Sequence, residues 1–176
     1  SDENTRIGVA GNSYITVGDS LTEGIYDLYN ADNQSLDGRI IGKQGFQAHL
    51  NDLLTTSTLT NILFNEAVGG DKTPDTLTRI DSILERHPGS NRALMMLGTN
   101  DSGGSTPLSS SQYKDNMQLL ANRMIARGKS VWISLIPPAL PYAENATRNG
   151  DIEGYNAAIK TMSNIQIGPD FFLILL

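Results

Sequence analysis

The chain has 176 residues and carries 13 lysines and arginines against 19 aspartates and glutamates, which gives a formal net charge of −6. This length fits a single domain that buries a core of its own. The basic residues are scattered, which argues against a nucleic-acid partner, because nucleic-acid binding usually needs a clustered basic face. Without any cysteine, the sequence excludes disulfides, thiolate metal sites and cysteine nucleophiles.

The start of the chain is polar, and the longest apolar run, 171–176, is too short to span a membrane. The first residues, 1–4, fit either the mature end of a chain after removal of a signal peptide or an arbitrary boundary. We slightly favour a secreted or periplasmic location. Nothing in the sequence indicates an oligomeric state.

Apolar runs and helical patterns alternate along the whole chain. The clearest helix has Met117, Leu120 and Met124 at helical spacing and ends before Gly128. In chain order, we expect strands near 13–17, 62–67, 92–97, 130–136 and 171–176, and helices near 21–29, 43–55, 74–87, 109–127 and 152–163. Strands that alternate with helices predict right-handed crossovers, and therefore a three-layer α/β/α sandwich around a flavodoxin-like parallel sheet of about five strands.

A seven-residue segment, Gly-Asp-Ser-Leu-Thr-Glu-Gly at 18–24, follows the first expected strand and places Ser20 where the strand passes into a helix. A serine at this turn lies at the carboxyl edge of the sheet, close to N–H groups of the helix. That geometry suits a nucleophile, because the N–H groups can stabilise the oxyanion that its attack creates. Gly-Asp-Ser is also ordinary turn and N-cap chemistry, so the segment alone leaves both interpretations open.

Two further polar clusters directly follow apolar runs. Gly70 lies in the cluster at 65–73, and Asn100 lies in Gly-Thr-Asn-Asp at 98–101. Because the carboxyl ends of parallel strands meet at one edge of a sheet, we expect both residues to converge with Ser20 on one crevice. A hydroxyl, a glycine N–H and an asparagine amide are the parts of an acyl-transfer site. The loop at 137–151 is a candidate wall of its pocket.

In these three blocks the sequence resembles the SGNH hydrolases, also called the GDSL-type esterases and lipases. The block I serine of that family matches Ser20, the block II glycine matches Gly70, and the block III Gly-x-Asn-Asp matches 98–101. The resemblance implies a serine hydrolase that cleaves small carboxylic esters through an acyl-enzyme on Ser20, without a cofactor or metal. It also implies an oxyanion hole formed by the N–H groups of Ser20 and Gly70 and the side-chain amide of Asn100.

The fourth block of that family, Asp-x-x-His near the C-terminus, is absent, because Asp170 is not followed by a histidine three residues later. We expect the two histidines, His49 and His87, to be ordinary surface or packing residues, with His87 at the sheet edge opposite Ser20. We therefore expect one domain over 1–176 that lacks its C-terminal segment. We also expect its turnover to be impaired, because the catalytic histidine is missing. A genuine short variant that binds ligands without efficient turnover is the alternative.

Two other functions share this fold. The first is a catalytically impaired binding module that recognises acylated carbohydrate in the same crevice, but binding alone does not require an oxyanion hole. The second is a phosphate or nucleotide binder, but Asp71 separates the glycine and lysine that a phosphate loop would join. Asp19, Asp71 and Asp101 would surround the crevice. Without histidine or cysteine among them, we expect them to cap helices and brace loops rather than bind a divalent metal.

Overall fold

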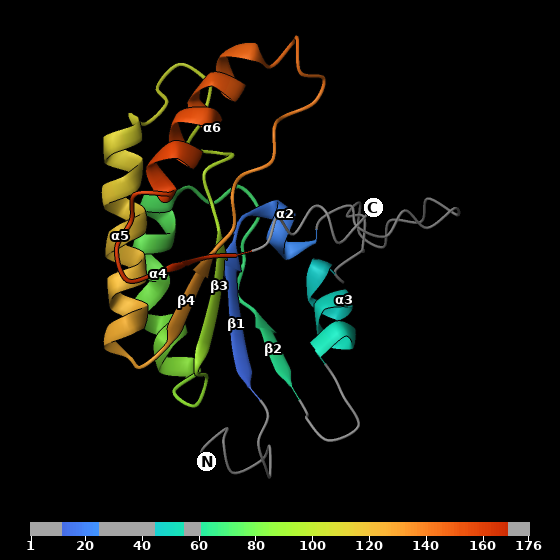
Figure 1. Ribbon diagram of the computed structural model, residues 1–176, viewed down its shortest axis with the longest axis vertical. Coiled ribbons are helices and arrows are strands. Elements are labelled where there is room, and N and C mark those ends of the chain that lie inside the picture. Colours follow the sequence, from blue (N-terminus) through green and yellow to red (C-terminus); the bar gives the residue numbers. More distant parts are fainter. Residues whose placement is uncertain (1–11, 25–44, 55–60, 169–176) are drawn as a thin grey trace.

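The computed structural model of the chain describes residues 12–24, 45–54 and 61–168. The strands are β1 (Ser13–Gly18), β2 (Ile62–Asn65), β3 (Arg92–Met96), β4 (Ser130–Ile133) and β5 (Gln166–Ile167), and the helices are α2 (Ser20–Glu23), α3 (Gly45–Leu54), α4 (Thr73–Arg86), α5 (Ser110–Ala126) and α6 (Ala146–Ile159). All strands are parallel, in the order β2-β1-β3-β4-β5. Helices α4, α5 and α6 cover one face of the sheet and α3 covers the other (Figure 1). The predicted three-layer α/β/α fold is confirmed.

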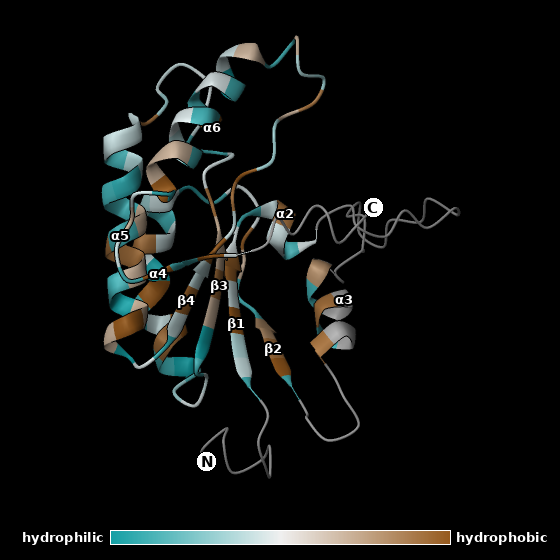
Figure 2. Ribbon diagram, viewed as in Figure 1, coloured by the Kyte–Doolittle hydropathy of each residue, from teal (hydrophilic) through white to brown (hydrophobic). Residues whose placement is uncertain are grey.

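The central strands bury side chains on both faces of the sheet. Ile15 and Val17 of β1 belong to the larger cluster with α4, α5 and α6, whereas Tyr14 packs with Phe46 of α3 on the other face. In Figure 2 brown segments alternate with paler ones along the strands, and the outer helices carry both brown and teal segments. Burial on both faces explains why these strands read as nearly continuous apolar runs.

Helix ends follow from local hydrogen bonds. At the start of α5, the Ser109 hydroxyl accepts the Gln112 N–H at 3.2 Å, and the Gln112 side chain accepts the Ser109 N–H at 3.1 Å. This reciprocal capping box satisfies donors that the first helical turn cannot use. Gly128, with φ of +78°, follows the helix in the left-handed conformation that glycine adopts most readily. The structure thus places α5 within one residue of each expected end.

Helix α6 begins at Ala146, six residues before the expected start at 152, and ends at Ile159 rather than 163. The early part of the helix carries polar packing that apolar periodicity does not detect. Asn149 is 1% exposed, and its amide both accepts the Ala139 N–H at 2.7 Å and donates to the Ala139 carbonyl at 3.0 Å. A buried asparagine therefore fixes this turn where the pattern contains no large apolar residue.

The fifth strand also lies earlier than expected. Strand β5 consists of Gln166 and Ile167, which pair with Trp132 and Ile133 of β4. Both residues of β5 are exposed, so no apolar run marks them in the sequence. The segment expected to form this strand, 171–176, lies outside the described residues. None of the helices within the described ranges has the length and apolar character needed to cross a membrane.

Tyr155 ties α6 to the loop after β3. The side chain is buried, its ring stacks on Tyr113 with centroids 4.2 Å apart, and its hydroxyl donates toward the carbonyls of Asp101 at 2.9 Å and Leu108 at 2.7 Å. Burial raises the pKa of Tyr155 to about 12, so the hydroxyl keeps its proton and remains a donor.

We predict that Tyr155→Phe lowers the free energy of unfolding by about 1–3 kcal/mol, because buried carbonyls lose their partner. Tyr142→Phe is the matched control. The hydroxyl of Tyr142 donates to Glu153 at the surface, and its loss should change the stability by less than about 0.5 kcal/mol. Urea denaturation of both variants measures the difference, and equal losses would show that the buried hydrogen bonds do not hold the loop.

Candidate active site

The turn from β1 into α2 places Ser20. A Cβ atom at Gly18 would lie 2.1 Å from the Thr22 hydroxyl oxygen and 2.7 Å from the Met96 carbonyl oxygen, so only glycine fits there. Asp19 caps the helix, and its carboxylate accepts the Leu21 N–H at 3.0 Å. Ser20 is therefore the first residue of α2, at the carboxyl end of the sheet, and its side chain is half-buried.

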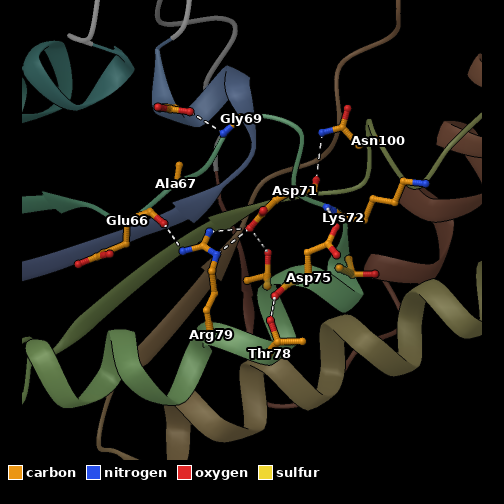
Figure 3. Close-up of polar contacts among 12 residues, drawn as sticks. Glu66, Ala67, Gly69, Asp71, Lys72, Asp75, Thr78, Arg79 and Asn100 are labelled. Atoms are coloured by element: carbon orange, nitrogen blue, oxygen red, sulfur yellow. Dashed lines mark hydrogen bonds and ion pairs between the residues drawn. The ribbon is translucent and has the colours of Figure 1, made fainter.

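The loop after β2 carries Gly70 against this turn. The Val68 N–H donates to the Gly18 carbonyl at 3.1 Å, and the Asp71 N–H donates to the Val68 carbonyl at 3.1 Å. Gly70 has a φ of +86°, which explains why glycine stands at this position. The Gly69 N–H, labelled in Figure 3, donates to a carboxylate oxygen of Glu23, the last residue of α2.

The loop after β3 carries Asn100 and closes the arrangement. Its first residue, Gly98, has a φ of +130°, and a Cβ atom there would lie 2.4 Å from a methyl carbon of Ile136. The Asn100 side-chain amide donates to the Asp71 carbonyl at 3.0 Å, as Figure 3 shows. The structure therefore joins the loops that bear Gly70 and Asn100 directly, and joins both to the turn that bears Ser20.

Each of the three sequence-predicted donors keeps a hydrogen that is not used inside the described structure. No described residue accepts the N–H of Ser20 or the N–H of Gly70, and the Asn100 amide uses one of its two hydrogens on Asp71. Neighbouring N–H groups, such as those of Leu21 and Asp71, are paired. An arrangement of unused donors on adjacent loops can bind a negatively charged oxygen.

The three aspartates of this region are bound to loops and helix starts. The Asp71 carboxylate accepts the Arg79 guanidinium at 2.7 Å and the Thr76 hydroxyl at 3.0 Å, and the Asp101 carboxylate accepts the Thr73 N–H and hydroxyl at 3.0 and 2.6 Å. These contacts match the expected capping and bracing. Among the described residues, no group of three histidine, cysteine, aspartate or glutamate side chains could hold a metal ion.

Burial governs the protonation of Asp19 and Asp101. Asp19 is 1% exposed, and burial raises its pKa from 3.8 to about 6, while the charges of Asp101 and Asp71 raise it further and the Leu21 N–H lowers it. Burial likewise raises the pKa of Asp101, against the hydrogen bonds from Thr73 that lower it. Above about pH 6, the turn before Ser20 therefore contains a poorly solvated negative charge.

His87 lies at the opposite end of the sheet from Ser20. Its carbonyl accepts Lys129 Nζ at 2.9 Å, and the turn it starts leads to Asn91, whose N–H donates to the carbonyl of Ser13, the first residue of β1. Its ring nitrogen Nε2 lies 2.6 Å from a carboxylate oxygen of Glu66. His49 belongs to α3, and its side chain is not among those described. Among described side chains, no histidine therefore lies beside Ser20.

The structure reveals supporting residues that the sequence analysis did not single out. Gln47 of α3 is buried, and its amide donates to the Thr16 hydroxyl at 2.9 Å and to the Thr22 carbonyl at 2.8 Å. The Asn65 amide donates to the Glu23 carbonyl at 3.3 Å. Together they hold the short helix α2 against β1 and β2. No local pattern indicates such contacts, since α3 lies more than twenty residues from α2 in the sequence.

Two hollows lie along the loop at 137–151. One, of about 320 Å³, is lined by Leu21 next to Ser20, Thr99 next to Asn100, and the segment 137–140. Most of its surface is apolar. The other, of about 290 Å³, is more polar and is lined by Gly103, Gly104, Glu144, Asn145, Thr147 and Arg148. Part of the loop at 137–151 therefore lines a hollow next to the neighbours of Ser20 and Asn100 in the chain.

We predict that Asp19→Asn changes the pH dependence of stability. Because the pKa of Asp19 is higher in the folded than in the unfolded chain, the folded state binds this proton more tightly, and the free energy of unfolding falls as pH rises from about 4 to about 6. Asparagine keeps the cap without the charge. The free energy of unfolding of the variant relative to that of the wild type should therefore rise by about 1–3 kcal/mol between about pH 4 and about pH 6. Above about pH 6 this difference should not rise further. Denaturant unfolding at pH 4, 5, 6 and 7 tests this, and a constant difference would contradict it.

Comparisons with known proteins agree with this fold. Solved structures share the fold: a lipase/acylhydrolase from Enterococcus faecalis is 15% identical with a TM-score of 0.69, over 92% of this chain and 77% of its own. The psychrotrophic esterase EstA from Pseudoalteromonas sp. is 17% identical with a TM-score of 0.60, over 89% and 76% of the two chains. Est24, a carbohydrate acetylesterase from Sinorhizobium meliloti, is 17% identical with a TM-score of 0.58, over 93% and 94%.

At these identities the solved structures establish the fold alone. Among curated proteins, no sequence matches the chain. The model of the GDSL-like Lipase/Acylhydrolase family matches residues 16–166, which include the loops that carry Ser20, Gly70 and Asn100. Since this match covers most of the sequence, the chain belongs to the GDSL-like lipase/acylhydrolase family of hydrolases.

Proposed function

We propose that this chain carries a serine esterase site that cleaves small carboxylic esters through an acyl-enzyme on Ser20. The observation that carries the proposal is the set of unused donors on adjacent loops: the N–H groups of Ser20 and Gly70 and one hydrogen of the Asn100 amide. Membership of the GDSL-like family supports the same chemistry. No cofactor enters the proposed reaction.

In the proposed reaction the Ser20 hydroxyl oxygen attacks the ester carbonyl carbon, and the carbonyl oxygen becomes an oxyanion held by the three donors. Collapse of the tetrahedral intermediate breaks the ester C–O bond, leaves the acyl group on Ser20 and expels the alcohol, which takes up the proton that the Ser20 hydroxyl loses. Water then attacks the acyl-enzyme, which releases the acid and returns a proton to the Ser20 oxygen. Each donor of this kind typically contributes about 3 kcal/mol to transition-state stabilisation. Because the donors lie on loops already fixed by hydrogen bonds, little reorganisation is needed when the charge develops.

The hollow beside Leu21 supports an apolar group on the substrate. Its walls come from Leu21, next to the nucleophile, and from Pro137, Pro138, Ala139 and Leu140. We assign this hollow to the acyl chain of the ester. Structural relatives include a carbohydrate acetylesterase, so acetylated sugars belong beside aryl esters among the substrates to test.

The binding module that recognises acylated carbohydrate remains the second candidate, on one specific observation. The Ser20 hydroxyl has no hydrogen-bond partner among the described residues, and a serine without a base is a poor nucleophile near neutral pH. On this alternative, acetylated sugar binds in the crevice and is released unchanged. Measurement of both turnover and binding separates the two functions.

We predict that Ser20→Ala abolishes hydrolysis of aryl acetates while leaving the fold intact. Ser163→Ala, which changes an exposed serine far along the chain, is the control and should retain full activity. Release of the aryl alcohol is followed by absorbance, and product from acetylated sugars by mass spectrometry. Unchanged turnover in Ser20→Ala would remove Ser20 from the mechanism. Binding of acetylated sugar without turnover by the wild type would favour the binding module.

We predict that Ala139→Trp shifts the acyl preference toward acetate, because the indole fills the hollow that longer chains would occupy. The kcat/KM for hexanoate should fall by roughly 10-fold or more, whereas that for acetate should change by less than about 3-fold, in line with the few kcal/mol that apolar pockets contribute. Ala157→Trp, which changes an exposed alanine of α6 outside the residues that line the hollow, serves as the control. Equal losses for both esters would show that the acyl group binds elsewhere.

A further inference from the structure

The loop that presents Gly70 is not held by packing. Val68 is 43% exposed, Gly70 is exposed, and a Cβ atom at Gly70 would meet no atom within 4 Å. Gly69 and Gly70 form a pair without side chains, and glycine populates more backbone conformations than other residues. The direction of the Gly70 N–H must therefore be fixed by hydrogen bonds of its neighbours.

One side chain supplies such a bond on the residue directly before Gly70. A carboxylate oxygen of Glu23 accepts the Gly69 N–H at 2.5 Å. Across 68–70, the other bonded N–H is that of Val68, which donates to the Gly18 carbonyl, and the Gly70 N–H has no acceptor among the described residues. A hydrogen bond to a carboxylate is stronger than one between neutral groups, so this contact restrains the Gly-Gly pair more than a neutral bond would.

Glu23 is itself held at the nucleophile turn. It is the last residue of α2, of which Ser20 is the first. Its N–H donates to the Asp19 carbonyl at 2.8 Å, and its carbonyl accepts the Asn65 amide at 3.3 Å. The segment that carries Ser20 thus also carries the acceptor that fixes the loop of Gly70.

We propose that Glu23 is a positioning residue, which holds the Gly69 N–H so that the adjacent Gly70 N–H keeps its direction relative to Ser20. This role rests on the esterase function proposed above. Glu23 touches no reacting atom and acts through the Gly69–Gly70 peptide. Because a misdirected donor costs transition-state binding more than ground-state binding, the loss falls on kcat and leaves KM nearly unchanged.

Three variants test this role through turnover of an aryl acetate. Glu23→Ala removes the acceptor and should lower kcat by about 10- to 100-fold, somewhat less than the loss of a whole oxyanion donor. Glu23→Gln keeps an amide oxygen at the same reach and should restore kcat to within about 5-fold of the wild type. Glu85→Ala removes an exposed carboxylate from α4 and should change neither constant. Thermal melts of each variant identify any loss that reflects unfolding.

A second measurement does not depend on turnover. NMR relaxation reports the order parameter of the Gly70 N–H, which is about 0.85 for rigid backbone and below about 0.6 for flexible backbone. We expect a rigid value in the wild type and Glu23→Gln and a flexible one in Glu23→Ala, together with faster hydrogen exchange at Gly69. The Ser102 N–H, which donates to the Gly98 carbonyl, serves as an internal control.

The two measurements separate failure of this role from failure of the proposed function. An unchanged kcat or an unchanged Gly70 order parameter in Glu23→Ala overturns the positioning role. Full activity in Ser20→Ala overturns the esterase mechanism, and the order parameter alone then decides whether Glu23 holds the loop. If the wild type shows no turnover, the Gly70 order parameter likewise decides whether Glu23 holds the loop. A higher KM in Glu23→Ala, with kcat unchanged, would also contradict the proposal.

Discussion

The turn at Gly18 is the constraint on which the candidate site depends. A side chain there would collide with the Met96 carbonyl at the end of β3 and with Thr22 in α2, so the chain must pass close to β3 before the helix begins. The Gly18 carbonyl also accepts the Val68 N–H and thereby holds the loop after β2. One residue without a side chain thus brings together the ends of three strands. The turn that bears Ser20 and the loop that bears Gly70 are held by these contacts, and Asn100 joins them through its hydrogen bond to the Asp71 carbonyl.

Buried carboxylates surround this turn, and their charges limit what the site can bind. Asp71 pairs with Arg79, whereas Asp101 accepts the N–H and hydroxyl of Thr73 and Asp19 accepts the Leu21 N–H, which are neutral donors. Above about pH 6, the region therefore carries net negative charge in poor contact with water. A neutral ester enters such surroundings at a lower electrostatic cost than an anion does. The developing oxyanion must then lie closer to the N–H donors than to the carboxylates.

The sequence predicts most of the sheet because its central strands are buried on both faces. Apolar runs marked β1 to β4, and serine capping with a terminal glycine marked α5 within a residue. The start of α6 escaped prediction because its buried contact is made by an asparagine, Asn149, and β5 escaped because both its residues are exposed. In each case polar or short-range hydrogen bonding replaced the apolar signal on which the prediction relied.

The candidate site divides in the same way. Ser20, Gly70 and Asn100 were predictable because each directly follows an apolar run, and the carboxyl ends of parallel strands share one edge. The contacts of Gln47 and the contact of Glu23 with Gly69 could not be predicted, because they join segments that are distant in the sequence and leave no periodic signal. Glu23 did stand within the seven-residue segment around Ser20, so the motif marked the residue without indicating its contact. Topology thus made it possible to predict which loops meet at this edge, whereas the supporting contacts depend on tertiary structure that the sequence pattern does not show.

In the proposed mechanism the described loops carry the nucleophile and the oxyanion donors, whereas the proton acceptor for Ser20 is a separate part of such a site. In serine hydrolases, loss of the triad still leaves roughly 10³–10⁴-fold catalysis over water from the oxyanion hole and binding alone. A site with only the donors in place would therefore be slow rather than inert. It follows that the magnitude of turnover, more than its presence, reports whether a base acts on Ser20, while the direction of the Gly70 N–H reports whether the oxyanion hole is formed. Because these two properties arise from different parts of the chain, the donors can be complete whatever residue accepts the proton.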